Sequence, residues 1–161
     1  MNNELDPLAA EVGAALRSKG MMLATAESCT GGGISEAITD IAGSSAWFDR
    51  GFVTYSYEAK VDLLGVKRET LVDFGAVSEQ TALEMVGGAI ARSRAQVAVA
   101  VTGIAGPDGG MPDKPVGTVW FAWKFPKKPA ISEVCQFSGD RAAVRFQTIE
   151  HALKVLLHNL A

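Results

Sequence analysis

Apolar residues recur along this chain in runs that alternate between helical and strand spacing. Leucine and valine side chains recur every third or fourth position from Leu5 to Leu16, which predicts a helix over residues 4–19 that ends at Gly20. Residues 21–25 form a short apolar run typical of a buried strand, and residues 34–41 return to helical spacing. The chain therefore begins with a helix, a strand and a second helix.

The alternation continues to the end of the chain. β-branched and aromatic residues mark the predicted strands, while terminal glycines and N-capping residues such as Ser78 mark the helices. The strands are predicted at 51–55, 96–101, 116–123 and 131–137, and the helices at 58–64, 67–74, 79–92 and from Asp140 onward. Because the last two strands follow each other directly, we expect a three-layer α/β/α sandwich with a mixed β-sheet, formed by residues 1–161 as one domain.

Composition narrows the class of protein. The chain has 161 residues, 48% of them hydrophobic and 20% charged, which is typical of a globular domain. The net charge of −3 and the absence of a dense Lys/Arg run give no reason to expect a nucleic-acid partner. The sequence contains neither a signal pattern nor an apolar run of 18 residues, so we expect no membrane partner and a cytoplasmic location.

Cysteines and tryptophans add two expectations. Cys29 and Cys135 are too few for a disulfide framework. The chain has more large apolar side chains than one small core needs, in Trp47, Trp120 and Trp123 and in the apolar last helix. Since closed dimers are the commonest oligomers, we expect a homodimer.

A glycine-rich run at residues 26–33 joins the first strand to the second helix. It reads Ala-Glu-Ser-Cys-Thr-Gly-Gly-Gly, and the start of the following helix offers N–H groups that suit an anion such as phosphate. The run is not a P-loop, because Ile34 and Ser35 follow the glycines where a P-loop has Lys and Ser or Thr. It also lacks the G-x-G-x-x-G pattern of dinucleotide-binding folds. We interpret it as a binding loop of another kind.

A second glycine-rich loop, residues 102–110, follows a fully apolar strand. A long polar loop at the end of a buried strand is a frequent site position. Arg141 lies at a predicted helix start, where its charge opposes the helix dipole. Bidentate binding of a phosphate or carboxylate would explain an arginine there.

The residues for bond cleavage are harder to assign. His151 and His158 lie seven positions apart on the last helix with no nearby Cys or His, so we expect no metal site and no Ser-His-Asp triad. A desolvated lysine is an alternative base, and Lys60 and Lys114 are the two lysines that do not read as solvated. Lys60 lies just beyond a strand end, five residues after Tyr55. Spacing does not choose among the candidate nucleophiles, which are Ser28, Cys29, Thr30, Ser44, Ser45 and Thr102.

Several of these segments together match a known family. The matching runs are AESCTGG at 26–32, AGSSAWFDRGFVTYSYEAK at 42–60, GAVSE at 75–79, TGIAGPDGG at 102–110, KPVGTVWFAW at 114–123 and FSGDR at 137–141. With these runs in this order, the chain resembles the CinA C-terminal domain family, the stand-alone nicotinamide mononucleotide (NMN) amidases. Two-domain members carry a further N-terminal domain, which we expect to be absent because only 25 residues precede Ala26.

The resemblance implies hydrolysis of the NMN carboxamide to nicotinic acid mononucleotide and ammonia in pyridine nucleotide salvage, without a metal or other cofactor. It implies Ser45 as the nucleophile, Lys60 as its base and Tyr55 as the residue that relays or orients the proton. The substrate-binding positions that it implies are Ser28, Thr30, Gly31, Gly32, Thr102, Gly103 and Arg141.

Two other functions remain open on the sequence. One is a cysteine amidase that uses Cys29 with Glu27 and a lysine, since a thiolate at a helix start is reactive. The other is a nucleotide-binding module without catalysis, which would bind NMN and release no ammonia.

Overall fold

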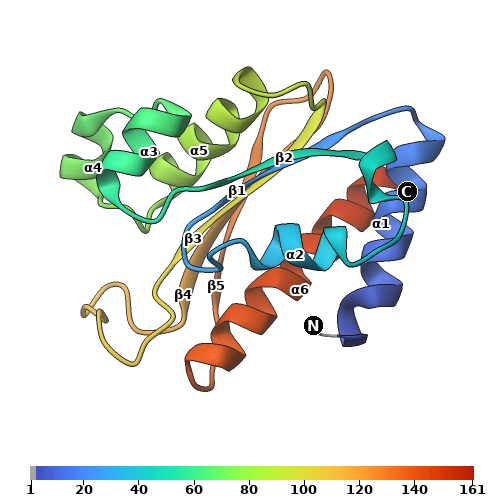
Figure 1. Cartoon of the computed structure of the whole chain (residues 1–161). Helices are drawn as coiled ribbons and strands as arrows, with labels where there is room; N and C mark the ends of the chain where they lie inside the picture. Colours follow the sequence, from blue (N-terminus) through green and yellow to red (C-terminus); the bar gives the residue numbers. More distant parts are fainter. Residues whose placement is uncertain (1–2) are drawn as a thin grey trace.

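The computed structural model describes residues 3–161, and its frame is one five-stranded sheet (Figure 1). The strand order is β2-β1-β3-β4-β5, in which β1, β2 and β3 are parallel and β4 and β5 are antiparallel. The strands are β1 (Leu23–Glu27), β2 (Phe48–Val53), β3 (Val97–Gly103), β4 (Thr118–Lys124) and β5 (Ile131–Gln136). The sheet is therefore mixed, as predicted.

Helices cover both faces of this sheet (Figure 1). One layer holds α1 (Asp6–Ser18), α2 (Gly33–Thr39) and α6 (Arg141–Leu160), and the other holds α3 (Tyr57–Leu64), α4 (Arg68–Phe74) and α5 (Glu79–Ala91). Two short 3₁₀ helices, η1 (Asn3–Leu5) and η2 (Ser44–Ala46), precede α1 and β2. This arrangement confirms the predicted three-layer α/β/α sandwich.

Side-chain alternation in β3 separates two cores. The valines at 97, 99 and 101 face the layer of α1, α2 and α6, whereas Ala98 and Ala100 face α5. Trp47 and Trp123 are 4% and 1% exposed in the first core, so two of the three tryptophans behind the homodimer expectation are used within the chain. No helix in the described part of the chain is long and apolar enough to cross a bilayer.

The predicted caps are present, and some element ends shift. Ser78 caps α5, and Asp140 caps α6 by accepting a hydrogen bond from the Ala143 N–H at 2.9 Å. β1 extends to Glu27 rather than ending at residue 25, because the backbone of Glu27 pairs with strands on both sides. Hydropathy does not predict a buried glutamate in a strand, so the predicted strand ended before Glu27.

The chain path places a crevice at the carboxyl end of β1. From β1 the chain passes through α2 to β2 on one side, and it returns through α3, α4 and α5 to β3 on the other side. The order of the strands thus reverses around β1, and in open α/β sheets ligands bind at the carboxyl ends of the strands at such a point. Ser28 is the first residue after β1.

Candidate active site

Lys60 is a buried lysine at the centre of this crevice. It lies on α3, whose first turn is capped by Ser56, and it is only 1% exposed. Its Nζ donates hydrogen bonds to Ser28 Oγ at 3.0 Å, to the Thr54 carbonyl at 2.8 Å and to the Tyr55 carbonyl at 3.2 Å. No carboxylate in residues 3–161 pairs with it. Burial therefore lowers the pKa of Lys60 to about 8.

Ser28 brings a hydroxyl to that amine. Its backbone N–H donates to the Val101 carbonyl of β3 at 3.1 Å, which fixes the residue at the end of β1. Its side chain is held against Lys60 and is almost fully buried at 7% exposure. In its neutral form Lys60 is able to accept the Ser28 proton, so the two residues have the geometry of a nucleophile and its base.

The carboxylate of Glu27 shapes the loop after Ser28. It accepts hydrogen bonds from the N–H groups of Ile34 and Ser35 at 2.8 and 3.0 Å, from Ser35 Oγ at 2.8 Å and from Thr30 Oγ1 at 2.5 Å. The protein's own carboxylate therefore occupies the start of α2. The N–H groups that the sequence suggested for a substrate phosphate are thus already hydrogen-bonded within the chain.

Ser45 does not lie near Lys60. It is exposed in η2, just before the amino end of β2, whereas Ser28 follows the carboxyl end of the parallel strand β1. At about 3.3 Å per residue, the five residues of β1 separate these two ends of the sheet by roughly 16 Å. The structure does not contain the Ser45–Lys60 pair implied by the resemblance.

Tyr55 contacts Lys60 only through its backbone carbonyl. Its side chain is 64% exposed, and its hydroxyl accepts a hydrogen bond from Arg141 Nη2 at 3.4 Å. The Tyr55 hydroxyl therefore belongs with Arg141 at the mouth of the site and makes no contact with the amine whose proton it was expected to relay.

Ser28 and Lys60 open into a cavity of about 240 Å³. Arg141 lies at its edge, with Nη1 donating to the Gly106 carbonyl at 2.7 Å, while Thr102 Oγ1 donates to the Ala76 carbonyl at 2.9 Å. The complete lining is Ser28, Cys29, Tyr55, Lys60, Ala76, Val77, Thr102, Gly103, Ala105 and Arg141. Its charged side chains are two cations, so the cavity favours an anionic ligand.

The lining divides the expected substrate-binding residues into two groups. Ser28, Thr102, Gly103 and Arg141 face the cavity. Thr30, Gly31 and Gly32 do not line it: the Thr30 hydroxyl is turned to Glu27, and the two glycines adopt φ values of 57° and 100° that let the loop turn into α2.

Cys29 is a weak candidate for the nucleophile. Its side chain is 5% exposed, and burial raises the pKa of its thiol to about 12. The thiol therefore remains protonated at neutral pH, while the thiolate is the reactive form. Glu27, the carboxylate expected to assist it, is committed to α2.

Arg145 is a residue that the sequence did not single out. Its Nε donates to the Cys29 carbonyl at 3.1 Å, and its Nη2 donates to the Thr30 carbonyl at 3.0 Å. It thus ties the loop after Ser28 to α6, one turn beyond Arg141. Nothing in the sequence distinguishes Arg145 from other polar residues of an amphipathic helix, because this contact depends on tertiary packing.

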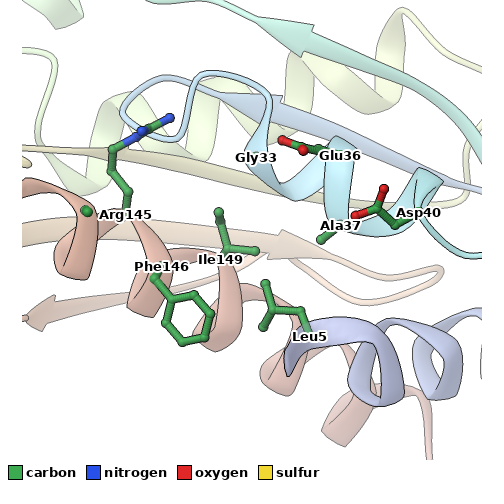
Figure 2. Close-up of a pocket in the computed structure, with 9 residues that line it drawn as sticks. Leu5, Gly33, Glu36, Ala37, Asp40, Arg145, Phe146 and Ile149 are labelled. Carbon is green, nitrogen blue, oxygen red and sulfur yellow. The ribbon is translucent and has the colours of Figure 1, made fainter. Parts of the chain in front are cut away.

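Arg145 also reaches across a second hollow, between α2, α6 and the start of α1. Figure 2 shows its guanidinium pointing from α6 toward the loop that precedes α2, above Phe146 and Ile149. This hollow has a volume of about 320 Å³. Its ionisable side chains are Glu36, Asp40 and Arg145, so it holds no hydroxyl or thiol beside a base. The cavity of Ser28 and Lys60 is therefore the candidate active site.

Comparison with known proteins agrees with the motifs. The model of the CinA C-terminal domain matches residues 5–160. The chain belongs to the CinA C-terminal domain family. Proteins named nicotinamide-nucleotide amidohydrolase PncC are 55% identical in Escherichia coli strain K12 and 54% identical in Pseudomonas putida. These matches cover 96% and 95% of this chain and 94% and 97% of the relatives.

Solved structures of CinA proteins share the fold. The competence/damage inducible protein CihA from Agrobacterium tumefaciens is 49% identical, with a TM-score of 0.95 over 98% of this chain and 96% of its own. A CinA superfamily protein from Escherichia coli is 38% identical, with a TM-score of 0.92 over 98% and 90%. The α/β/α architecture is therefore that of the CinA family.

Proposed function

We propose that this CinA-family protein hydrolyses the carboxamide of NMN to nicotinic acid mononucleotide and ammonia, with Ser28 as nucleophile and Lys60 as base. The observation that carries the proposal is the buried contact of 3.0 Å between Lys60 Nζ and Ser28 Oγ inside a cationic cavity. The names of the relatives from Escherichia coli and Pseudomonas putida support the substrate. The serine differs from Ser45, which the family resemblance implies.

The first half-reaction begins with Lys60 in its neutral form. Lys60 takes the Ser28 proton as Oγ attacks the carboxamide carbon, and the carbonyl oxygen becomes negative. The backbone N–H groups of Cys29 and Thr30 follow Ser28 directly and donate to no backbone carbonyl in the described chain, so they are the candidate donors to that oxygen. Lys60 then gives its proton to the leaving nitrogen, which departs as ammonia and leaves an acyl ester on Ser28.

The second half-reaction returns the enzyme to its starting state. Neutral Lys60 removes a proton from water as the water oxygen attacks the ester carbon. The Ser28 oxygen leaves and recovers a proton from Lys60, and the acid product is released. The overall reaction consumes only NMN and water, because both side chains return to their starting states.

The charged side chains of the cavity support one orientation of the substrate. Arg141 and the Tyr55 hydroxyl lie at the same edge of the cavity and are suited to bind the 5′-phosphate. The pyridinium ring would then lie beside Lys60, where its positive charge lowers the lysine pKa further. Binding of the substrate thus favours the neutral amine that the first step requires.

The deciding experiment measures ammonia release from NMN by the Ser28→Ala, Lys60→Met and Ser45→Ala variants. We expect kcat to fall by about 10²–10⁴-fold for Lys60→Met and at least as much for Ser28→Ala, because each removes half of the dyad. Ser45→Ala is the matched control, and it should retain wild-type activity. An inactive Ser45→Ala with an active Ser28→Ala would restore Ser45 as the nucleophile.

The two alternative functions are separated with the same assay. A Cys29→Ala variant that still releases ammonia removes the cysteine amidase. If the wild type binds NMN and releases no ammonia on prolonged incubation, the protein is a nucleotide-binding module and the mechanism above is wrong.

The place of the reaction in pyridine nucleotide salvage follows from its substrate and product and belongs to this proposal. The homodimer and the cytoplasmic location also stay predictions. Light scattering at micromolar concentration tests the first, and cell fractionation tests the second.

A further inference from the structure

Three potential metal ligands meet at the edge of the sheet opposite β2. Glu133 and Cys135 are two residues apart on the edge strand β5, so their side chains share a face. Their partners on β4 are Phe121 and Val119, both of which belong to the core beneath α6. That face brings Glu133 and Cys135 to His151 of α6, and one ligand atom from each of the three residues lies within 4.8 Å of the others.

Aromatic packing fixes the orientation of the His151 ring. Its centroid lies 4.9 Å from that of Phe121 and 6.3 Å from that of Phe137, with interplanar angles of 70° and 66°. The ring directs Nε2 toward β5, where it forms a hydrogen bond with Glu133 Oε1. The ligand nitrogen is therefore held in place by the core before any ion binds.

We propose that Glu133, Cys135 and His151 form a binding site for a divalent transition-metal ion of the Zn²⁺ type. One thiolate, one imidazole and one carboxylate are the ligand types that Zn²⁺ takes, and three protein ligands leave a fourth tetrahedral position for water. With metal–ligand bonds of about 2.0–2.3 Å, neighbouring donors around the ion lie about 3–4 Å apart. The separation in the structure thus needs only small side-chain adjustments.

An ion pair explains the contact between Glu133 and His151 but not the position of Cys135 beside them. Glu133 and His151 pair at a surface where their side chains are 47% and 28% exposed, but that pair does not need a thiol beside it. Exposure also leaves a path for an ion. Binding replaces the Glu133–His151 hydrogen bond with two bonds to the metal, and the Cys135 thiol releases its proton to solvent as the sulfur–metal bond forms.

The site is separate from the proposed amidase chemistry. β5 is three places from β1 in the sheet, and none of the three ligands lines the cavity of Ser28 and Lys60. An ion there would join the edge strand β5 to α6. We expect such an ion to stabilise the fold and to hold the exposed edge of the sheet in place. The proposal therefore does not depend on the function of the cavity.

The test adds Co²⁺ to the metal-free full-length protein under a non-thiol reductant and follows its absorption spectrum. We expect a sulfur-to-cobalt charge-transfer band that saturates at one ion per chain and is removed by stoichiometric Zn²⁺. Cys135→Ser should abolish the band, and His151→Gln should weaken binding at least tenfold. His158→Gln, on the same helix, is the matched control and should behave as the wild type.

Thermal unfolding gives a second readout. Zn²⁺ should raise the Tm of the wild type and of His158→Gln and leave that of Cys135→Ser unchanged. Absence of the charge-transfer band, a band that survives in Cys135→Ser, or an equal Tm shift in all variants would overturn the site. Circular dichroism of each variant without metal confirms that the substitutions leave the fold intact.

Discussion

At the scale of single residues, the protonation state of Lys60 sets the pH dependence of the proposed reaction. The base must be neutral to accept the Ser28 proton, and burial lowers its pKa from 10.5 to about 8. We therefore expect kcat/KM for NMN to rise about tenfold per pH unit below pH 8 and to level off above it. Initial rates of ammonia release across pH 6–10 check this, with Ser45→Ala as the control that keeps the same profile. A rate that is flat across this range would exclude Lys60 as the base.

The two serines show what the sequence revealed about the site and what it did not. The glycine-rich run, the lysine and Arg141 were all recognised as candidates from residue type and position, and the structure brings Ser28, Lys60 and Arg141 into one cavity. Residue type does not distinguish Ser28 from Ser45, because the approach to Lys60 depends on strand order. Once β1 lies between β2 and β3, its carboxyl end holds the candidate site, and Ser45 lies at the other end.

At the scale of elements, α6 contributes two arginines with different tasks. Arg141 faces the cavity, while Arg145 donates to the carbonyls of Cys29 and Thr30 and so positions the loop that carries Ser28, the proposed nucleophile. We expect Arg145→Met to lower kcat by about 10–100-fold with little change in KM, because misplacement by about 1 Å costs this much. Arg145→Lys should recover part of kcat.

The matched comparison is Arg141→Met, which should raise KM for NMN more than it lowers kcat. Steady-state kinetics of the three variants separate the two tasks. If Arg145→Met changes KM alone, Arg145 contacts substrate and does not position the loop.

The elements themselves were predictable because hydropathy and capping act locally. Helices α3 and α5 begin within one residue of the predicted positions, and Ser78 caps α5 as expected. Tertiary contacts were not predictable in this way. The contact of Lys60 with Ser28 and the meeting of Cys135 with His151 both join segments that only the completed fold brings together.

At the scale of the whole molecule, the buried amine of Lys60 lowers the stability of the fold that holds it. Lys60 is buried without a counter-ion in the described chain, and burial lowers its pKa from the ordinary value of 10.5 to about 8. Below pH 8 the folded state carries this buried charge at a cost of about 3 kcal/mol. Between pH 8 and 10.5 the unfolded chain binds the proton and the folded chain does not, so this cost disappears as the pH rises.

Replacing Lys60 with Met should therefore stabilise the protein while it lowers kcat. At pH 7 we expect a net gain of about 1–2 kcal/mol, because the carbonyls of Thr54 and Tyr55 lose their donor and offset part of the 3 kcal/mol. The gain should shrink as the pH rises from 8 to 10.5, since the wild type then folds with a neutral amine. Urea unfolding of both proteins at pH 7, 9 and 10.5 measures the difference. Two stability curves that stay parallel across this range would show that Lys60 folds with an unperturbed charge, and the low-pKa base would have to be abandoned with it.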